Sequence, residues 1–440
     1  MKQLLMKTDA IQKIVTSQKR QAETMYRESR FCVHVPCEKG ELLYNTLTGA
    51  LVLLETGETE QQNMDRLIEE RFWIPNDYDE QAYCDSLRKI SRMLHPEKNK
   101  KHFTILTTTD CNARCYYCYE MGIRRFSMSE KTANDVVAYI ARVSKGERVT
   151  LNWFGGEPLY NSNVIEIICN GLKKRGVSYQ STMISNGFFL DPDTANDAKK
   201  NWNMTNVQIT LDGTEHVYNQ TKAYTNCNEN AFRRVLDNIE AAIALGINIS
   251  IRLNMDSKNA DDLFGLADEL SSRFRGRKEI HTYVQLLQEV TGKIGAFSSE
   301  QLAAEKCIEL TNKLVEQGLT VTPKLNRDLI TNRCMADNDA CEVIAPDGKI
   351  CRCEHYKESE IVGSIYNDER NQDLVDTWKE YVTFPECKEC VLYPRCFILK
   401  KCDWSAKGCP ESIRTFKTER MKRQILVTFR ESAQRLIEEK

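Results

Sequence analysis

The apolar positions divide the chain into three zones. Between residues 101 and 290, short apolar and β-branched runs alternate with longer segments in which apolar residues recur every three to four positions. This alternation predicts strands and helices in turn, and so a parallel sheet wrapped by helices, either doubly wound or an open barrel. The predicted strands are residues 102–108, 148–153, 180–184, 207–211, 248–254 and 280–287. The predicted helices are residues 130–145, 163–174, 194–200, 231–245 and 260–274.

The zone before it, residues 1–100, has a different pattern. A basic leading segment predicts a helix, and residues 29–36 and 41–44 predict a hairpin around the turn at Glu38-Lys39-Gly40. Three further segments with helical spacing are residues 46–55, 63–71 and 79–94. A hairpin with three short helices suggests a small winged helix-turn-helix; on pattern alone an ordinary α+β cap domain is favoured.

The third zone begins after the alternating pattern ends. Residues 300–317 predict a helix and residues 320–325 a short strand, and together they bridge the core to a segment rich in cysteine. Within that segment, Pro346-Asp347-Gly348 predicts a turn.

Composition excludes several classes of protein. The chain has 440 residues, 41% of them hydrophobic and 28% charged, which suits real hydrophobic cores and not disorder. Lys+Arg 61 against Asp+Glu 63 gives a net charge of -2, which argues against a nucleic-acid partner. We find no apolar run of membrane-spanning length and no signal-peptide pattern, so we expect a soluble, cytoplasmic protein without a membrane partner.

Cysteine is the informative residue type. Of 18 cysteines, nine lie between Cys334 and Cys409 and three at Cys111, Cys115 and Cys118. A disulfide framework is typical of short secreted chains, so these clusters predict thiolate metal ligands instead. The remaining six are expected to be small buried apolar side chains: Cys32, Cys37, Cys84, Cys169, Cys227 and Cys307.

The loops after the predicted strands carry the unusual residues, and ligand sites lie at the carboxyl ends of parallel strands. Cys111, Cys115 and Cys118 follow the first strand with C-x3-C-x2-C spacing. Three thiolates on one [4Fe–4S] cluster leave one iron open to an outside ligand. A structural zinc site would need a fourth ligand, and that loop has no His.

This loop, with Tyr117 before its third cysteine, resembles the radical S-adenosylmethionine (SAM) family. The resemblance implies a partial (β/α)6 barrel, within an α/β fold, in which the three cysteines hold the SAM-binding [4Fe–4S] cluster. The residues that it implies for SAM binding are Tyr117, Gly155, Gly156, Glu157, Pro158, Ser185, Asn186, Asp212 and Lys222. Lys222 stands where many relatives have an arginine facing the SAM carboxylate, and a lysine keeps the charge but not the bidentate geometry.

The same resemblance implies the chemistry. One electron cleaves SAM to methionine and a 5′-deoxyadenosyl radical, which abstracts hydrogen from a substrate, and an electron donor such as flavodoxin or ferredoxin is expected. A non-catalytic iron–sulfur carrier is the alternative, but it would have no need of the SAM-contact residues.

The cysteine-rich zone resembles the SPASM extension of radical SAM enzymes that modify peptides, which carries two auxiliary [4Fe–4S] clusters. The resemblance implies one ligand set of Cys334, Cys341, Cys353 and Cys402. It implies a second set of Cys387, Cys390, Cys396 and Cys409. The choice between Cys351 and Cys353 and the altered spacing at Cys402 stay open, and zinc ribbons are the alternative because Cys387-x2-Cys390 is also a zinc spacing.

The N-terminal zone resembles the winged helix-turn-helix element that binds a leader peptide in some peptide maturases. The expected domains are therefore residues 1–100 for leader recognition, 101–290 for the radical SAM core, 291–333 as a bridge and 334–440 for SPASM. The expected activity is installation of a thioether or carbon–carbon cross-link in a ribosomally made precursor peptide. An anaerobic sulfatase-maturating type of protein oxidase and a cross-linking maturase of an enzyme subunit are the alternatives.

Glu354 directly follows the expected ligand Cys353. In the sulfatase-maturating relatives the matching position carries a general base, so the resemblance implies that role for Glu354. A solvated turn over residues 354–357 explains the residue equally well.

Overall fold

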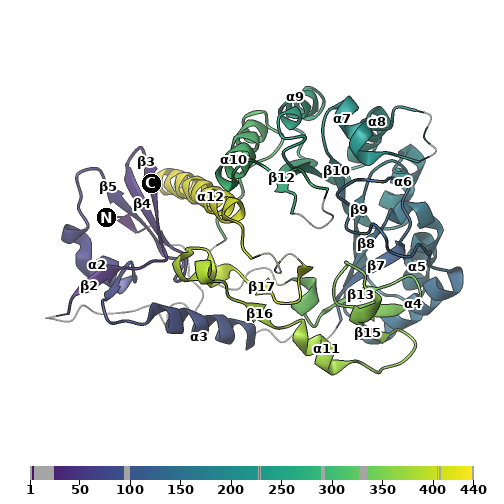
Figure 1. Ribbon diagram of the computed structural model, residues 1–440, viewed down its shortest axis with the longest axis horizontal. Coiled ribbons are helices and arrows are strands. Elements are labelled where there is room, and N and C mark those ends of the chain that lie inside the picture. Colours follow the sequence, from purple (N-terminus) through teal and green to yellow (C-terminus); the bar gives the residue numbers. More distant parts are fainter. Residues whose placement is uncertain are drawn as a thin grey trace.

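The computed structural model describes residues 2–3, 24–93, 100–225, 227, 229–288, 293–326, 334–403, 405 and 408–438. A nine-stranded sheet forms its centre, in the order β12-β11-β10-β9-β8-β7-β13-β14-β15 (Figure 1). Six of these strands run parallel: β7 (His102–Thr108), β8 (Val149–Gly155), β9 (Tyr179–Ser185), β10 (Met204–Leu211), β11 (Asn248–Met255) and β12 (Ile280–Leu286). All six strands predicted for this zone are confirmed.

Helices cover the outer face of this sheet (Figure 1). They are α4 (Glu130–Val143), α5 (Ser162–Lys174), α6 (Pro192–Lys200), α7 (Glu215–Lys222), α8 (Ala231–Ala244) and α9 (Asp262–Phe274). Large apolar side chains such as Trp153, Phe232 and Phe274 are fully buried between helices and strands. Because β12 ends the strand order instead of pairing with β7, the barrel is open, as predicted. The five predicted helices are confirmed, and α7 was not predicted because its sequence, EHVYNQTK, is short and polar.

The N-terminal region folds around a second sheet, of order β1-β5-β4-β3. Its strands are β1 (Lys2–Gln3), β3 (Cys32–Cys37), β4 (Gly40–Asn45) and β5 (Leu51–Glu55), and β2 (Tyr26–Glu28) pairs separately with β6 (Trp73–Pro75). The hairpin β3–β4 and the helices α2 (Met64–Glu69) and α3 (Glu80–Met93) are confirmed. The predicted leading helix lies outside the described residues.

The helix predicted at residues 46–55 is wrong, because part of this segment is strand β5. One face of the sheet packs on α12 (Glu411–Glu438) through Leu51 and Leu53, and the other packs on α2 through Val52 and Leu54. A strand that is buried on both faces gives a continuous apolar run, whose periodicity does not distinguish it from a buried helix.

The C-terminal region extends the central sheet. β13 (Cys341–Ile344) pairs parallel with β7, and β14 (Lys349–Cys351) and β15 (Ile361–Ser364) follow antiparallel. The predicted turn at residues 346–348 joins β13 to β14, with a hydrogen bond of 2.9 Å from Gly348 N–H to the Ala345 carbonyl. The remaining elements here are α11 (Gln372–Thr377), β16 (Tyr381–Val382) and β17 (Ile398–Leu399).

Two long helices connect these regions. α10 (Glu300–Glu316) packs along α12, and α12 runs from the core to the N-terminal sheet (Figure 1). Ile413 and Phe416 of α12 pack against the central core, whereas Ile425 and Phe429 pack against the N-terminal sheet. The predicted strand at residues 320–325 does not form; this segment is irregular, and Leu325 packs into the N-terminal core.

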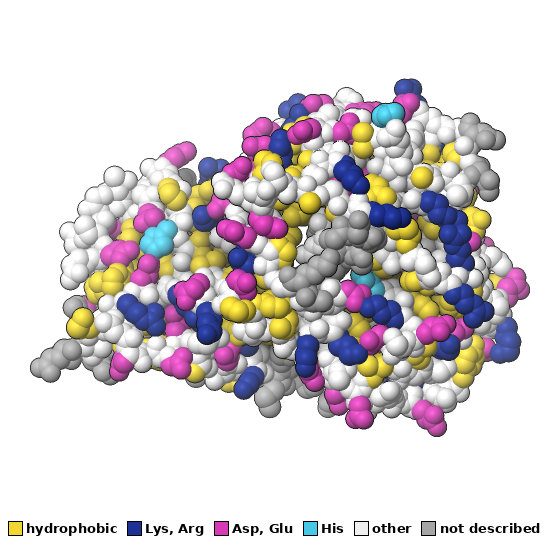
Figure 2. All heavy atoms as spheres, viewed as in Figure 1, with side chains coloured by type: hydrophobic (Ala, Val, Ile, Leu, Met, Phe, Trp, Pro, Cys, Tyr) yellow, Lys and Arg dark blue, Asp and Glu magenta, His cyan; other side chains and the backbone are white. Residues whose placement is uncertain are grey.

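The surface carries both signs of charge. Acidic and basic side chains are interspersed over the face in Figure 2, in keeping with the net charge of -2. Among the described residues, no helix has the length and apolar character needed to cross a membrane.

Candidate active site

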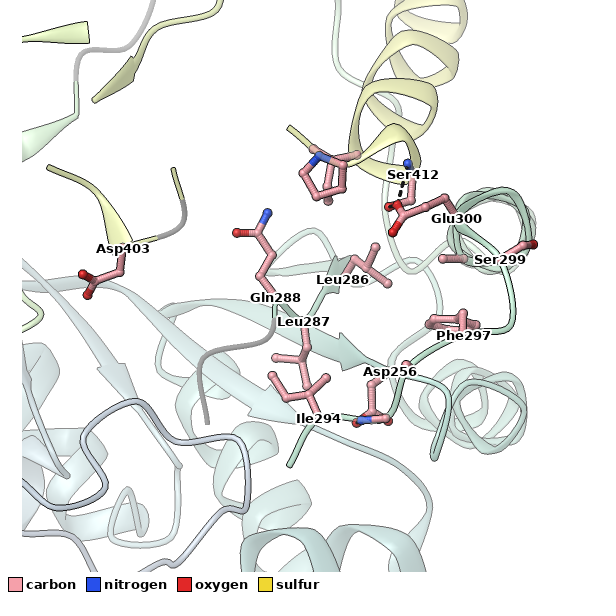
Figure 3. A pocket seen from close by; sticks show the side chains of 15 residues that line it. Asp256, Leu286, Leu287, Gln288, Ile294, Phe297, Ser299, Glu300, Asp403 and Ser412 are labelled. Atoms are coloured by element: carbon pink, nitrogen blue, oxygen red, sulfur yellow. Dashed lines mark hydrogen bonds between the residues drawn. The ribbon is translucent and has the colours of Figure 1, made fainter. Parts of the chain in front are cut away.

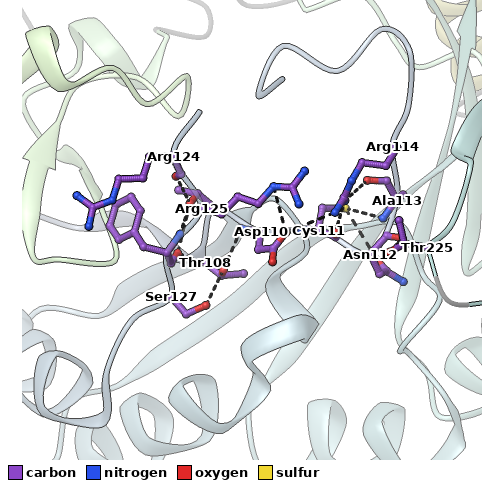
Figure 4. A network of polar contacts seen from close by, with 12 residues as sticks. Thr108, Asp110, Cys111, Asn112, Ala113, Arg114, Arg124, Arg125, Ser127 and Thr225 are labelled. Carbon is purple, nitrogen blue, oxygen red and sulfur yellow. Dashed lines mark hydrogen bonds and ion pairs between the residues drawn. The ribbon is translucent and has the colours of Figure 1, made fainter. Parts of the chain in front are cut away.

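The loop that follows β7, called here the three-cysteine loop (residues 109–118), is shaped by its own polar contacts (Figure 4). Asp110 N–H donates to Thr108 Oγ1 at 3.0 Å, and Cys111 N–H donates to the Asp110 carboxylate at 2.8 Å. Arg125 Nε lies 3.5 Å from the same carboxylate. These contacts turn the chain sharply at the carboxyl end of the strand.

Two glycines, Gly155 at the end of β8 and Gly156 directly after it, allow the three-cysteine loop to touch this strand end. A Cβ atom at Gly156 would lie 2.2 Å from the Asp110 carbonyl oxygen, and one at Gly155, where φ is +122°, would lie 2.0 Å from the Thr108 carbonyl oxygen. Glu157 N–H donates to the same Asp110 oxygen at 2.9 Å. The close approach excludes every side chain larger than hydrogen at these two positions.

Glu157 joins this contact to β9. Its carboxylate is fully buried and accepts hydrogen bonds from Leu159 N–H at 3.1 Å, Ser185 Oγ at 2.8 Å and Asn186 N–H at 2.7 Å. Burial raises the pKa of Glu157 to about 7, against the opposing effect of the hydrogen bonds. A carboxylate has about four lone-pair sites, so these three donors leave room for one more.

Asn186 ties the third strand end to the three-cysteine loop. Its Nδ2 donates to Asn112 Oδ1 at 2.7 Å and lies 3.8 Å from Cys111 Sγ. Asn112 in turn accepts from Thr225 N–H at 2.8 Å through its carbonyl oxygen. Asn112 was not predicted as a site residue. Its position between Cys111 and Cys115 could have indicated that it links the three-cysteine loop to a neighbouring strand end.

The fourth strand end supplies a buried charge pair. Lys222 Nζ lies 2.8 Å from Asp212 Oδ2 and donates to Tyr117 Oη at 3.2 Å, and Tyr117 Oη donates to the same Asp212 oxygen at 2.7 Å. The lysine side chain is 3% exposed and the aspartate 0%. Two of the three N–H groups of Lys222 therefore bond to protein atoms, and only one remains for a ligand.

The three thiols of the loop lie close enough to act on one another electrostatically. Burial raises the pKa of Cys111 and of Cys118 to about 12. The negative charges of Glu157, Cys115 and Cys118 raise the pKa of Cys111 further, and those of Glu120 and Cys115 raise that of Cys118. Burial also raises the pKa of Cys115, and the Lys222 ammonium opposes that shift. Converging thiols that are costly to ionise without a cation suit a metal cluster that takes three thiolates.

One buried atom beside these thiols has no partner. Asp212 Oδ1 is buried and accepts no hydrogen bond from the described residues. A buried carboxylate oxygen of this kind calls for a donor from a bound molecule. The residues present therefore fit both a cluster and a polar ligand next to it.

The C-terminal cysteines fall into two groups by their electrostatic neighbours. Cys402 acts on both Cys334 and Cys353, and the negative charges of Glu354, Cys334 and Cys402 add to the effect of burial in raising the pKa of Cys353. Cys390 and Cys396 are likewise acted on by Cys409, and Cys390 also by Cys387. The first group holds three of the four cysteines of one implied set and the second holds all four of the other, whereas Cys341 stands at the start of β13.

Cys351 is set apart from both groups. It ends β14, is 1% exposed, and packs in an apolar cluster with Leu106, Phe154 and Val343. Cys353 lies two residues later in a bend and packs against a different cluster, together with Cys402. The structure thus separates the two thiols: Cys353 lies in the same cluster as Cys402, and Cys351 does not.

Glu354 lies between the two cysteine regions. Its Oε2 is 3.8 Å from Cys353 Sγ, and the next residue, His355, stacks on Tyr119 with ring centroids 3.7 Å apart. Tyr119 directly follows Cys118 of the three-cysteine loop. The segment is therefore packed against that loop and is not a fully solvated turn.

A cavity of about 370 Å³ opens at the same edge of the sheet (Figure 3). Its walls come from the ends of β11 and β12 and the starts of α10 and α12, and include Asp256, Leu286, Phe297 and Ile413. Asp256 Oδ2 accepts from Tyr116 Oη at 2.7 Å, so one wall is fixed by the three-cysteine loop. Asp256 was missed from the sequence, although it lies two residues after a predicted strand and the rule about strand ends could have found it.

The family model of the Radical SAM superfamily matches residues 105–270, from β7 to α9. The chain therefore contains a radical SAM domain, and that domain implies a [4Fe–4S] cluster and SAM as cofactors.

Two curated relatives share parts of this sequence. Over 197 residues the chain is 21% identical to the radical SAM cyclopropyl synthase TigE of Paramaledivibacter caminithermalis. The matched stretch covers 40% of this chain and 40% of TigE. Over 73 residues it is 36% identical to an uncharacterized protein of Methanocaldococcus jannaschii, covering 16% of this chain and 25% of the relative. The chain thus matches well under half the length of either relative.

Solved structures share the fold over longer stretches. Native anSMEcpe with bound AdoMet and the Cp18Cys peptide superposes with a TM-score of 0.59 at 16% identity, over 75% of this chain and 99% of that chain. SuiB of Streptococcus suis bound to its precursor peptide SuiA superposes with a TM-score of 0.51 at 12% identity, over 88% of this chain and 98% of that chain. A match over 88% of the chain must include part of the N-terminal region, since residues 100–440 alone make up only about three quarters.

Proposed function

We propose that this protein is a radical SAM enzyme that modifies a ribosomally made precursor peptide by installing a thioether or carbon–carbon cross-link. The observation that carries the proposal is the convergence of four strand ends on the three-cysteine loop. Glu157, Asn186 and Lys222 each contact that loop or its neighbours through hydrogen bonds of 3.2 Å or less. Such preorganisation is what a site that controls a reactive radical requires.

Each of these residues has a proposed task. Cys111, Cys115 and Cys118 hold the cluster, and the cofactor pair supplies a 5′-deoxyadenosyl radical when both are bound. Gly155, Gly156 and Pro158 shape the backbone wall, and the one open lone pair of Glu157 accepts from the SAM ammonium group. Ser185 and Asn186 line the site at the third strand end.

Tyr117, Asp212 and Lys222 form the opposite wall in this proposal. Asp212 Oδ1 accepts a donor of the bound molecule, and the remaining N–H of Lys222 faces an anionic group. Because the lysine also neutralises Asp212, its removal would leave a buried charge without a partner, which is strongly destabilising.

The C-terminal cysteines are proposed to hold two auxiliary [4Fe–4S] clusters. The proposed ligands are Cys334, Cys341, Cys353 and Cys402 for the first, and Cys387, Cys390, Cys396 and Cys409 for the second. Glu354 is proposed as the general base for a substrate bound between the two cysteine regions. An external electron donor such as flavodoxin or ferredoxin would reduce the clusters.

The N-terminal region is proposed to capture the leader of the precursor. Strand β3 ends its sheet and has β4 as its one neighbour among the described strands, so an extended peptide can add to it. The structural match that extends into this region is to a protein bound to a precursor peptide. The cavity beside Asp256 would take a side chain of the peptide core, since pockets of a few hundred Å³ with mainly apolar walls suit such groups.

The activity is tested by anaerobic assay of 5′-deoxyadenosine from SAM with a chemical reductant. The wild-type protein should form it, and the Cys111→Ala/Cys115→Ala/Cys118→Ala variant should not. Cys227→Ala, a cysteine outside both regions, is the control and should leave the rate unchanged. Retained cleavage in the triple variant would refute the radical SAM assignment of these cysteines.

Leader capture is tested by hydrogen–deuterium exchange with a precursor peptide. The amides of β3 should become protected, and those of β2 should not. A peptide without its leader is the control and should protect neither strand. Protection confined to the cavity walls would contradict the assignment of the N-terminal region.

A second candidate, a protein oxidase of the sulfatase-maturating type, is favoured by the high coverage of anSMEcpe, 99% of that chain. Mass spectrometry separates the two reactions. An intramolecular cross-link joins two residues of one peptide, whereas an oxidase leaves each residue unlinked.

A further inference from the structure

Among the six cysteines outside both cysteine regions, Cys32 has distinct surroundings. Cys84, Cys169 and Cys307 are completely buried in apolar cores, as predicted from the sequence. Cys32 is not: its Sγ lies 3.7 Å from His34 Nε2, and His34 Nε2 lies 2.5 Å from Glu28 Oε1. Cys32 does pack against an apolar cluster, as predicted, but it is only partly buried and its thiol also lies beside a titratable side chain.

Local structure explains why these side chains meet. Cys32 and His34 stand two residues apart on β3, so both point to the same face of the sheet. Glu28 ends β2, the strand that precedes β3 in the chain and pairs with β6. The ligand atoms of the three residues all lie within 4.8 Å of one another, the one group of this kind in the described part of the chain.

We infer that Glu28, Cys32 and His34 form a binding site for a divalent zinc ion. Thiolate, imidazole and carboxylate are the ligands that Zn²⁺ takes in proteins, with bonds of about 2.0–2.3 Å. Tetrahedral bonds of that length put sulfur and nitrogen about 3.6 Å apart, and the observed separation is 3.7 Å. The contact between His34 and Glu28 would open by about 1 Å as the ion replaces the proton between them.

The second ring nitrogen of His34 makes the kind of contact that zinc-binding histidines make. The other ring nitrogen, His34 Nδ1, lies 3.2 Å from Glu41 Oε1 on the adjacent strand β4. A metal-bound His almost always donates its second N–H to a carboxylate or carbonyl, which fixes the tautomer and orients the ring. Glu41 is thus a positioning residue for a ring whose Nε2 faces the two other ligands.

The surrounding charge is suited to a dication. Burial raises the pKa of the Cys32 thiol above its usual range, and the carboxylates of Glu28, Glu60 and Glu41 raise it further. Glu28 and His34 are 41% and 37% exposed, so an ion can enter from solvent and keep a water as its fourth ligand. The site would fasten β2 to β3 at the edge of the N-terminal sheet.

The site is tested with the complete iron-loaded protein. After incubation with ZnCl₂ and removal of free metal, zinc and iron per chain are measured by mass spectrometry. The wild type should retain one zinc more than the Cys32→Ser/His34→Gln variant at equal iron content. Cys37→Ser is the matched control, since Cys37 lies on the same strand with its side chain on the opposite face, and it should bind zinc as the wild type does.

Equal zinc in the wild type and the double variant would overturn the proposal. X-ray absorption at the zinc edge provides a measurement that needs no variant. One sulfur with nitrogen and oxygen neighbours supports the site, whereas a shell of four sulfurs assigns the zinc to the C-terminal cysteines and rejects it. Glu41→Gln should weaken zinc binding by about 10–100-fold in competition with a chromogenic chelator, without removing a ligand.

Discussion

The two cysteine regions of the molecule are held in different ways. In the three-cysteine loop, each neighbouring residue comes from the end of a parallel strand, so one sheet edge positions the whole set. In the C-terminal region, most of the cysteines lie in irregular segments or beside short 3₁₀ turns, and the segment around Cys396 is held by the N-terminal region. Arg88 of α3 donates to the Cys396 carbonyl at 2.7 Å, and its guanidinium stacks 4.0 Å from Phe397.

This difference separates what a sequence specifies locally from what it leaves to tertiary structure. The first geometry follows from strand ends that each carry their own motif. The second depends on contacts between residues about 300 positions apart, such as Tyr393 Oη with Asp85 at 2.5 Å. A change in the first region should thus act on SAM cleavage, and a change in the second on the fate of the substrate.

The largest effect that sharpens this comparison is expected at Glu354. Glu354→Gln keeps size and hydrogen bonding but removes basicity, so modified peptide should fall by about 10²–10⁴-fold. Formation of 5′-deoxyadenosine should continue, because the three-cysteine loop is intact. Liquid chromatography with mass spectrometry measures both products, and Glu358→Gln, in the exposed part of the same segment, is the control. An undiminished yield of modified peptide would leave Glu354 without a catalytic role.

The next prediction tests whether contacts at the sheet edge fix the position of the three-cysteine loop. Gly156→Ala places a Cβ atom 2.2 Å from the Asp110 carbonyl oxygen, so the three-cysteine loop must move. A displacement near 1 Å costs about 10²-fold in a well-oriented site, and SAM cleavage should fall by that amount. Gly265→Ala in α9, whose Cβ would meet nothing closer than 3.5 Å, should leave the rate unchanged. A variant at Gly156 with the wild-type rate would show that the loop is not fixed by this contact.

The same contrast explains how much could be predicted from the sequence. The central strands were predicted from their apolar runs, and a short motif follows each of the first four. Asp256, which follows β11, belongs to no such motif and was missed. Strand β5 was not predicted, since burial on both faces removes the alternation that identifies a strand. The choice between Cys351 and Cys353 could not be made from the sequence, because residues two apart on a strand share one face. In the structure β14 ends at Cys351, so the two side chains have different surroundings.

A smaller effect is expected from variants that compare Cys353 with Cys351. Cys353→Ala should remove one auxiliary cluster, about four irons per chain, and leave SAM cleavage in place. Cys351→Ala should keep all the iron and lower stability by about 1–3 kcal/mol, because it only shortens a buried side chain in an apolar cluster. Iron analysis and thermal unfolding measure the two outcomes. Loss of iron in the Cys351 variant would reverse the assignment.

The smallest expected effect is a change of stability with pH at the site of Cys32. Like the C-terminal region, this site depends on contacts between different elements of the fold. In metal-free protein, the hydrogen bond that the His34 ring donates to Glu28 raises the pKa of His34 to about 9, although burial opposes it. A His whose folded-state pKa is raised contributes stability fully below its unfolded pKa of about 6.5, and that contribution is lost as pH rises through about 9. The other titratable groups that face the ring are Glu41 and Cys32, and Glu60 acts on Cys32.

The zinc-bound protein should show the opposite trend. Zinc must displace protons from the thiol and the imidazole, so its stabilising effect grows as pH rises over the same interval. Exchange protection of the β3 and β4 amides, corrected for the intrinsic rate, should therefore fall between pH 6.5 and 9 with a chelator present and rise with zinc. His34→Gln removes the titrating group and one ligand together, so its protection should vary with neither pH nor zinc. If the wild type shows the falling trend in both conditions, a proton occupies the place between Glu28 and His34, and no metal does.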